Sequence, residues 1–162
     1  MRHAKKLVSL TAVMLLAACT DNGLTNPMTD AAGNYQLTVY AGKTLPATYT
    51  IQPGDPNYPS YPNGATFVVT DGSLSLYSNG TFTETNNYTI TPSGQSAQRG
   101  AFARNGTWSL FGSDLTLDIP PQGNNSAIRD TGTLTIDANG NYTVNYTEDN
   151  GFGGFDAFEY KR

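Results

Sequence analysis

The sequence predicts an all-β protein, a small antiparallel up-and-down β-barrel of about eight to ten strands. Apolar and polar residues alternate strictly over many short stretches, which is typical of strands with one buried face. No window places apolar residues at positions i, i+3, i+4 and i+7, so we expect no amphipathic helix. The pairs Asn79-Gly80, Asn105-Gly106 and Asn139-Gly140 supply the positive φ angles of tight hairpin turns. These features favour strands joined in sequence order by short turns.

The alternating stretches define the expected strands one by one. A glycine followed by alternating apolar positions begins several of them, as at Gly33, Gly106 and Gly132. Short links favour a meander that closes into a barrel and so leaves no unpaired edge, with a sandwich as the alternative. Two stretches on either side of Asp71-Gly72 can form one bent strand. The expected strands are 34–40, 47–52, 65–70, 73–77, 81–90, 106–111, 114–119, 132–136, 141–147 and 155–161.

The same alternation assigns a buried face to each strand. The opposite face carries Thr, Ser, Asn and Asp, whereas a transmembrane barrel exposes apolar residues and uses strands of about 9–11 residues. We therefore expect a barrel with an apolar interior and a surface that faces water. Each large side chain contributes roughly 1.5–3 kcal/mol when it is buried, which is ample for one core. The expected inner residues are Tyr35, Leu37, Val39, Tyr49, Ile51, Phe67, Val69, Leu74, Leu76, Phe82, Tyr88, Ile90, Trp108, Leu110, Leu115, Leu117, Ile119, Leu134, Ile136, Tyr142, Val144, Tyr146, Phe158 and Tyr160.

The amino terminus has the pattern of a bacterial lipoprotein signal. A basic start is followed by an apolar stretch at 7–18, which is shorter than the roughly 20 residues that cross a bilayer and is typical of a cleaved signal peptide. Leu16-Ala17-Ala18-Cys19 resembles the lipobox, in which the cysteine receives a diacylglycerol whose acyl chains include palmitate. An ordinary signal peptide is the alternative. We expect a lipoprotein signal peptide at 1–18, a lipid-anchored flexible tether at 19–32 and one folded domain at 33–162.

Such processing removes most of the usual catalytic chemistry. His3, the single histidine, leaves with the signal peptide, and Cys19, the single cysteine, becomes a thioether. The mature chain then lacks Ser-His-Asp catalysis, Cys-His catalysis and the usual zinc ligands. We expect no enzyme, no catalytic residue, no metal site and no cofactor.

Charge and the anchor indicate the partners and the location. Six Lys and Arg remain after cleavage against thirteen Asp and Glu, a net charge of about −7 that argues against nucleic acid and anionic lipid surfaces. The protein is therefore expected to contact the membrane through the lipid on Cys19, because two or three acyl chains anchor a protein firmly in a bilayer. In the sorting pattern of diderm lipoproteins, an aspartate directly after the cysteine favours the inner membrane. Thr20 occupies that position, so we expect outer-membrane attachment with the domain facing the periplasm.

The order of motifs resembles the lipocalin-like domains of small secreted bacterial lipoproteins. In that group "G-x-Y-x-L…G-x-x-L-P" opens the domain and "G-x-L-x-L-x-x-x-G-x-[FY]" forms a central hairpin. The first motif is matched by Gly33, Tyr35, Leu37, Gly42, Leu45 and Pro46, and the second by Gly72, Leu74, Leu76, Gly80 and Phe82. The resemblance covers nearly all of 33–162 and implies a small barrel with a bound apolar ligand. The helix near the carboxyl terminus of many lipocalins has no counterpart in the sequence.

Three segments are candidates for a site. In the loop 53–64, prolines should keep the chain extended and present Tyr58 and Tyr61 to a ligand, or both rings lie back on the barrel rim. The segment 137–148 has acidic and amide residues at calcium-loop spacing but lacks the glycine at the sixth position, so we expect a hairpin. Four carboxylates near the carboxyl terminus, Glu148, Asp149, Asp156 and Glu159, are expected to be solvated.

Two functions remain open from the sequence. The first is a binding module for a small hydrophobic or amphipathic ligand, and the second is a structural or protein-interaction lipoprotein whose barrel is fully packed. The predicted inner face is rich in aromatic rings, and an eight-stranded barrel is only just wide enough for its own side chains. This favours a packed barrel or a shallow mouth over a deep calyx. We expect a monomer in either case.

Overall fold

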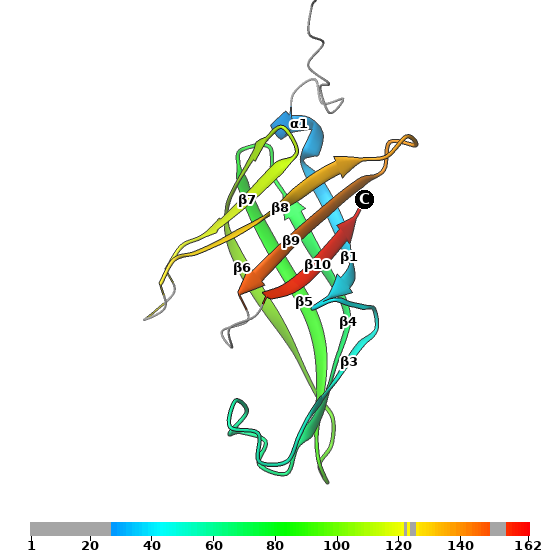
Figure 1. The fold of residues 1–162 in the computed structure, drawn as a ribbon, viewed down its shortest axis with the longest axis vertical. Helices are drawn as coiled ribbons and strands as arrows, with labels where there is room; N and C mark the ends of the chain where they lie inside the picture. Colours follow the sequence, from blue (N-terminus) through cyan, green and yellow to red (C-terminus); the bar gives the residue numbers. More distant parts are fainter. Residues whose placement is uncertain (1–26, 122, 124–125, 150–154) are drawn as a thin grey trace, which may run out of the picture.

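A computed structural model of the chain describes residues 27–121, 123, 126–149 and 155–162. Eight antiparallel strands close into a barrel (Figure 1), which confirms the predicted fold class. They are β1 (Gly33–Tyr40), β4 (Ala65–Leu76), β5 (Thr81–Pro92), β6 (Gln98–Phe111), β7 (Asp114–Ile119), β8 (Ile128–Ile136), β9 (Tyr142–Asp149) and β10 (Phe155–Lys161). From β4 to β10 each strand pairs with the next along the chain, and β1 pairs with both β10 and β4 to close the ring.

Three further elements flank the barrel: the helix α1 (Pro27–Ala31) and the short strands β2 (Lys43–Thr44) and β3 (Ala47–Ile51). The helix begins with proline, whose fixed φ suits the first helical position. Ala31 is fully buried, and Met28 packs against the core. Residues 27–31, expected within a flexible tether, therefore form a helix docked on one end of the barrel (Figure 1). In the described part of the chain, no helix is long and apolar enough to cross a membrane.

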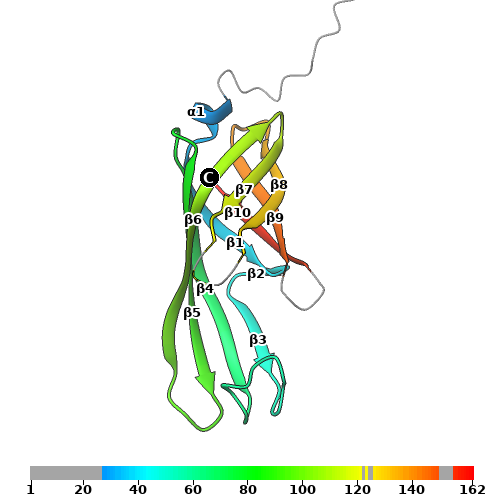
Figure 2. The same ribbon diagram turned by 90° about the vertical axis from the view of Figure 1, so that its left-hand side faces the viewer.

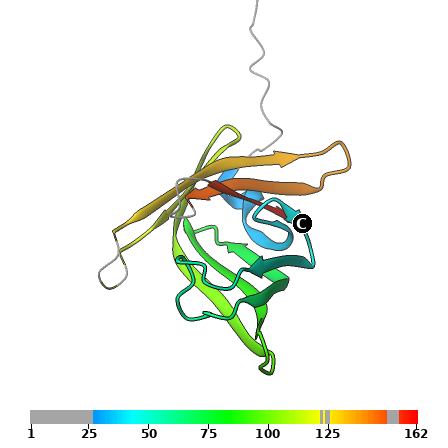
Figure 3. The same cartoon turned by 60° about the horizontal axis from the view of Figure 1, so that its bottom comes forward.

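Strands β4, β5 and β6 extend well beyond the segments that form the barrel wall. Only the second half of β4 pairs with β1, at 73–76, whereas its first half, 65–69, pairs with β3. A register shift between Val69 and Asp71 separates the two halves, as expected for one strand bent at this point. Strands β3 to β6 thus continue beyond the barrel as a curved sheet, which forms the lower end of the molecule in Figures 1 and 2. Figure 3 brings this end forward.

The barrel interior is packed with the side chains that alternation assigned to it. Trp108 is 3% exposed, and its indole N–H donates to the Tyr77 carbonyl at 2.9 Å. Other predicted inner residues lie in the same core, including Tyr35, Leu74, Leu76, Phe82, Leu115, Leu117, Leu134, Val144 and Tyr160. Every buried apolar side chain of the described residues lies between Ala31 and Tyr160. A chain that begins at Thr20 retains this whole core, so we expect it to fold without the preceding residues.

One predicted inner residue lies on the wrong face. Leu37 pairs with Tyr160 and Val39 pairs with Glu159, so the extra residue between them forms a bulge in β1. Because a bulge shifts the alternation by one residue, Val39 lies on the face of Glu159, and Tyr40 turns inward against Phe158, with ring centroids 5.1 Å apart. This correction matters because Tyr40 contributes to the site described below.

Candidate functional site

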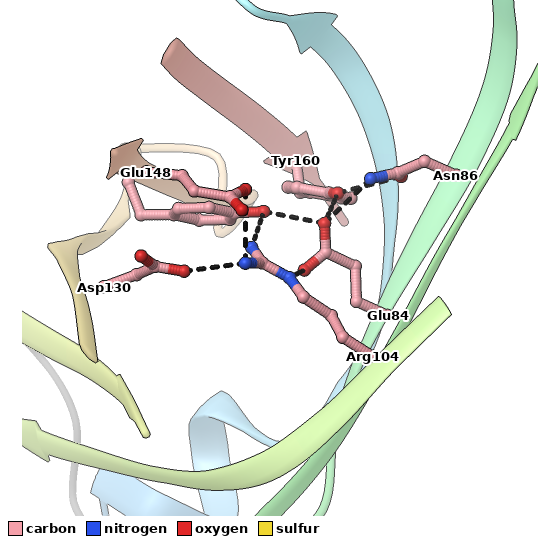
Figure 4. Close-up of polar contacts among 7 residues, drawn as sticks. Glu84, Asn86, Arg104, Asp130, Glu148 and Tyr160 are labelled. Carbon is pink, nitrogen blue, oxygen red and sulfur yellow. Dashed lines mark hydrogen bonds and ion pairs between the residues drawn. The ribbon is translucent and has the colours of Figure 1, made fainter. Parts of the chain in front are cut away.

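A buried network of polar side chains lies at the lower end of the barrel interior (Figure 4). Glu84 on β5 is 2% exposed and sits at its centre. One carboxylate oxygen accepts hydrogen bonds from the hydroxyls of Tyr146 at 2.7 Å and Tyr160 at 2.5 Å and from the Asn86 amide at 2.9 Å. The other accepts the Arg104 Nε–H at 2.6 Å. Both oxygens of the buried Glu84 carboxylate therefore accept hydrogen bonds within the protein.

Arg104 on β6 joins this network to two more carboxylates. Its guanidinium lies 2.6 Å from Glu84, 2.8 Å from Asp130 and 3.2 Å from Glu148. Burial lowers the pKa of Arg104, but the attraction of Tyr146, Glu84 and Glu148 outweighs burial and leaves the pKa above its ordinary value. One guanidinium thus faces three carboxylates, so the network carries excess negative charge when all of them are ionised.

Burial acts on the carboxyl groups in the opposite sense. It raises the pKa of Asp130 and of Glu148 above their ordinary values, and the charge of Arg104 opposes this effect only in part. Glu148 was expected to be solvated, and this expectation is wrong. Its side chain is in phase with the buried Val144 and Tyr146 of β9 and so points into the barrel.

Below the network the barrel opens into a polar pocket of about 220 Å³. Glu84, Arg104 and Glu148 line it from one side, and the rings of Tyr40, Phe102 and Phe158 belong to the same wall. The interior above it is filled by the packed core, so the hollow is a shallow mouth rather than a deep calyx.

A second hollow of about 310 Å³ adjoins this pocket, and we call it the aromatic cleft. Its lining comes mainly from the curved sheet formed by β3 to β6 and from the loop between β3 and β4. Tyr40 and Phe102 line both hollows, so the two are continuous. The rings that line the cleft are those of Tyr40, Tyr49, Tyr58, Tyr61, Phe67, Tyr88 and Phe102.

The rings on the sheet hold one another in place. Phe67 lies 5.0 Å from Tyr88 and 5.9 Å from Phe102 between ring centroids, and Tyr88 stacks on Phe102 at 4.6 Å. Gly100 makes this stack possible, because a Cβ at that position would collide with the Tyr88 ring. The Tyr49 hydroxyl donates to the Tyr40 carbonyl at 2.6 Å. The aromatic wall is therefore fixed by packing and hydrogen bonding.

The loop between β3 and β4 supplies the remaining two rings, and its conformation differs from the expected extended chain. Backbone N–H groups of Asp55, Tyr58, Tyr61 and Gly64 each donate to the carbonyl three residues earlier, at 2.9 to 3.2 Å. The loop is thus a series of four consecutive turns. A proline occupies the second position of each turn, where its fixed φ is favoured: Pro53, Pro56, Pro59 and Pro62.

This three-residue repeat brings the two predicted site residues together. Tyr58 and Tyr61 both line the aromatic cleft. Tyr61 packs against the small apolar cluster of Ile51, Ala65 and Ile90, whereas Tyr58 remains 41% exposed. Tyr61 therefore anchors the loop, and Tyr58 lies at the opening of the cleft.

Asp156 on β10 places a carboxylate in the same cleft. Burial raises the pKa of Tyr40 most strongly, and the neighbouring carboxylates Glu148, Asp156 and Glu84 raise it further. Burial and Asp156 together also raise the pKa of Tyr49. The negative potential of these carboxylates thus reaches the tyrosines of the cleft.

A larger groove of about 880 Å³ lies elsewhere, where β6 and β7 separate. Its charged lining residues, Asp118 and Arg129, pair with each other at 2.6 Å, and both are largely exposed. Most other lining side chains are outward-facing threonines and small apolar groups on the barrel surface. The groove therefore lacks the convergent polar groups and enclosing rings of a specific small-molecule site.

The other sequence candidates have simpler outcomes. Cys19 lies outside the described residues. Asp137 forms the turn between β8 and β9, where its carboxylate accepts the backbone N–H groups of Asn139 at 2.8 Å and Asn141 at 2.9 Å. This is the expected hairpin, and in the described part of the chain no cluster of three His, Cys, Asp or Glu side chains could hold a metal ion.

No protein-family model matches this chain, and no curated protein shows significant similarity to it.

Proposed function

We propose that this protein is a lipid-anchored protein of the bacterial cell envelope whose barrel binds a small amphipathic ligand. The aromatic cleft supports the binding role. Seven rings enclose it, and its volume of about 310 Å³ lies within the range of small-molecule pockets, roughly 300–1,000 Å³. A surface formed only to cover the core would not need rings on both sides of an open hollow.

The two adjoining hollows suit different parts of one ligand. The aromatic cleft accepts an apolar or planar body, and the pocket beside Glu84, Arg104 and Glu148 offers charged and hydrogen-bonding groups to a polar end. Mutual ring packing and the proline turns pre-form the cleft, which reduces the entropy lost on binding. These features favour an amphipathic ligand over a purely apolar one.

The anchor is proposed from the sequence. Lipidation of Cys19 would attach the chain to a bilayer through two or more acyl chains, each buried CH₂ contributing about 0.8 kcal/mol. Thr20 in the following position supports the outer membrane, with the barrel facing the periplasm. The acyl chains hold the protein close to a membrane surface, where amphipathic molecules gather.

One feature favours the alternative, a structural or protein-interaction lipoprotein. Residues 98–106 of β6 pair with β5 on one side and with no described strand on the other, because β7 pairs only with 107–111. An unpaired edge is a place where another chain can add a strand. This alternative predicts a protein partner at the edge and an empty cleft.

Native mass spectrometry of the chain from Thr20 to Arg162, after incubation with a cell-envelope extract, tests the binding role. We expect a reproducible adduct of low mass on the native chain, and its loss when Tyr58 and Tyr61 are both replaced by Ala. Tyr77→Ala is the matched control, because Tyr77 is also an exposed tyrosine, 46% accessible, but does not line the cleft.

Two results would refute the proposal. A chain that stays free of small molecules in every extract contradicts a binding role. An adduct that persists unchanged in the double variant shows that the ligand lies outside the aromatic cleft.

A further inference from the structure

We propose that the ligand of the aromatic cleft is an organic cation, such as a quaternary ammonium group attached to an apolar body. This inference rests on the proposed function and narrows its ligand class. Three features carry it: a carboxylate in the cleft, excess negative charge in the adjoining pocket, and the tyrosine rings that line the cleft.

The carboxylate in the cleft is Asp156. It lines the cleft among the rings, and no hydrogen bond or ion pair joins its side chain to another residue that the structure describes. Among the described residues, no basic side chain lines this hollow. An anionic ligand would therefore meet the carboxylate of Asp156 inside the cleft, so the lining disfavours negative charge.

The adjoining pocket adds negative charge. Arg104 lines it, and three carboxylates share its guanidinium at 2.6, 2.8 and 3.2 Å. Among the described residues, no other basic side chain lines this pocket, and the Arg104 donors toward Glu84, Asp130 and Tyr146 are already used. Arg104 therefore offers little to an anionic ligand, and the excess carboxylate charge remains to attract a cation. The raised pKa of Tyr40, to which burial and then Glu148 contribute, is consistent with that potential.

The rings suit a cation of low hydration. The face of a tyrosine attracts a cation within about 6 Å of its centroid, and cages of such rings bind quaternary ammonium groups. Tyr49 already holds one cation in this way, because the Lys43 ammonium lies 4.2 Å from its centroid. Lys43 does not itself line the cleft, and its contact with Tyr49 shows that a tyrosine of this lining attracts a cation.

Ligand-observed NMR titration of the chain from Thr20 to Arg162 with two isosteric probes tests the inference. Phenyltrimethylammonium and tert-butylbenzene have the same shape, and only the first is charged. We expect the cation to bind about tenfold more tightly, as one cation–π contact plus one carboxylate would provide. Benzoate, an anion of similar size, should not bind measurably.

Two variants assign the preference to the cleft. Asp156→Asn should weaken binding of the cation about fivefold and leave tert-butylbenzene unchanged, since it removes one charge without changing the shape. Asp114→Asn is the matched control, because it removes the same charge from an exposed residue at the β6–β7 turn, at the other end of the barrel (Figure 1).

The outcomes separate this inference from the proposed function. Equal binding of the two isosteres, or tighter binding of benzoate, would overturn the cation preference and leave an amphipathic-ligand site standing. An unchanged cation affinity in Asp156→Asn would also overturn it. Failure of all three probes to bind would count against the cleft as a site and so against both proposals.

Discussion

Replacement of Arg104 by Met should destabilise the barrel far more than the loss of an ordinary surface charge. The methionine keeps most of the stem volume but removes the guanidinium from three carboxylates, of which Glu84 and Asp130 are each 2% exposed. Removing one partner of a buried ion pair typically costs about 3–5 kcal/mol, because the remaining charge stays desolvated. Arg104 itself is 17% exposed and Glu148 32% exposed, so we expect about 3 kcal/mol, the lower end of that range.

The loss should depend on pH in a defined direction. Burial raises the folded-state pKa of Asp130 above its ordinary value, and Arg104 opposes this effect, so removal of the guanidinium should raise that pKa further. A group with a raised folded-state pKa stabilises the fold fully at low pH and loses that contribution as the pH rises through the folded-state pKa. The difference in stability between the native chain and Arg104→Met should therefore be larger at neutral pH and shrink on acidification.

Urea unfolding followed by Trp108 fluorescence measures both quantities. With a slope of about 2 kcal/mol per M, a loss of 3 kcal/mol lowers the midpoint by roughly 1.5 M. Arg129→Met is the control, because it breaks an equally short ion pair with Asp118 whose partners are 69% and 42% exposed, and such exposed pairs contribute little to stability. Equal losses in the two variants, or a loss in Arg104→Met that grows on acidification, would refute the reasoning.

Three further predictions concern the core and the anchor. Trp108→Ala should lower the free energy of unfolding by about 3–5 kcal/mol, the range for truncating a buried large aromatic. Native tryptophan emission should be blue-shifted, and emission like that of free tryptophan in the folded chain would contradict the 3% exposure of Trp108. Cys19→Ser should leave the barrel folded but release it from membranes or stall its processing, and membrane attachment of the fully processed variant would disprove lipidation. On a density gradient the native protein should band with the outer membrane, and the Thr20→Asp variant should band with the inner membrane.

Hairpins and alternation made the fold predictable from the sequence. The strands β7 and β10 have the expected bounds, and most others differ by one or two residues at their ends. The Asn-Gly pair at Gly80 forms a turn with φ of 81°, and the one at Gly140 a turn with φ of 83°. The turn predicted at Asn105-Gly106 is wrong, because both residues lie within β6 and pair with β5. Both features act between near neighbours in the chain, so the sequence alone contains them.

The polar interior was not predictable in the same way. Two barrel segments were missed, the first part of β6 at 98–105 and the start of β8 at 128–131. Both carry a charged residue at an inward position, Arg104 and Asp130. A charge on the buried face breaks the apolar alternation that defines a strand. The burial of Arg104 becomes reasonable only when its partners on three other strands, β5, β8 and β9, are known. The sequence does not supply that long-range information.

The loop conformation, by contrast, left a signal in the sequence. Proline recurs at every third residue from Pro53 to Pro62. A proline spacing of three matches consecutive turns that each span four residues and share their end residues, with Tyr58 and Tyr61 at equivalent positions. The extended conformation was the wrong interpretation of this pattern, and the turns place both rings in the lining of the aromatic cleft.

The buried network is better explained by the cleft than by stability. A well-packed set of apolar side chains in place of such an ionic cluster is often as stable or more stable, so the barrel does not need Glu84, Arg104 and Asp130 in order to fold. Apolar side chains at these three positions would fill the pocket and would leave no charged group next to the aromatic cleft. The network instead places carboxylates in a pocket that adjoins the aromatic cleft and shares Tyr40 and Phe102 with it. A partly desolvated carboxylate cluster beside aromatic faces suits the organic cation that we propose, because partial burial strengthens the electrostatic attraction.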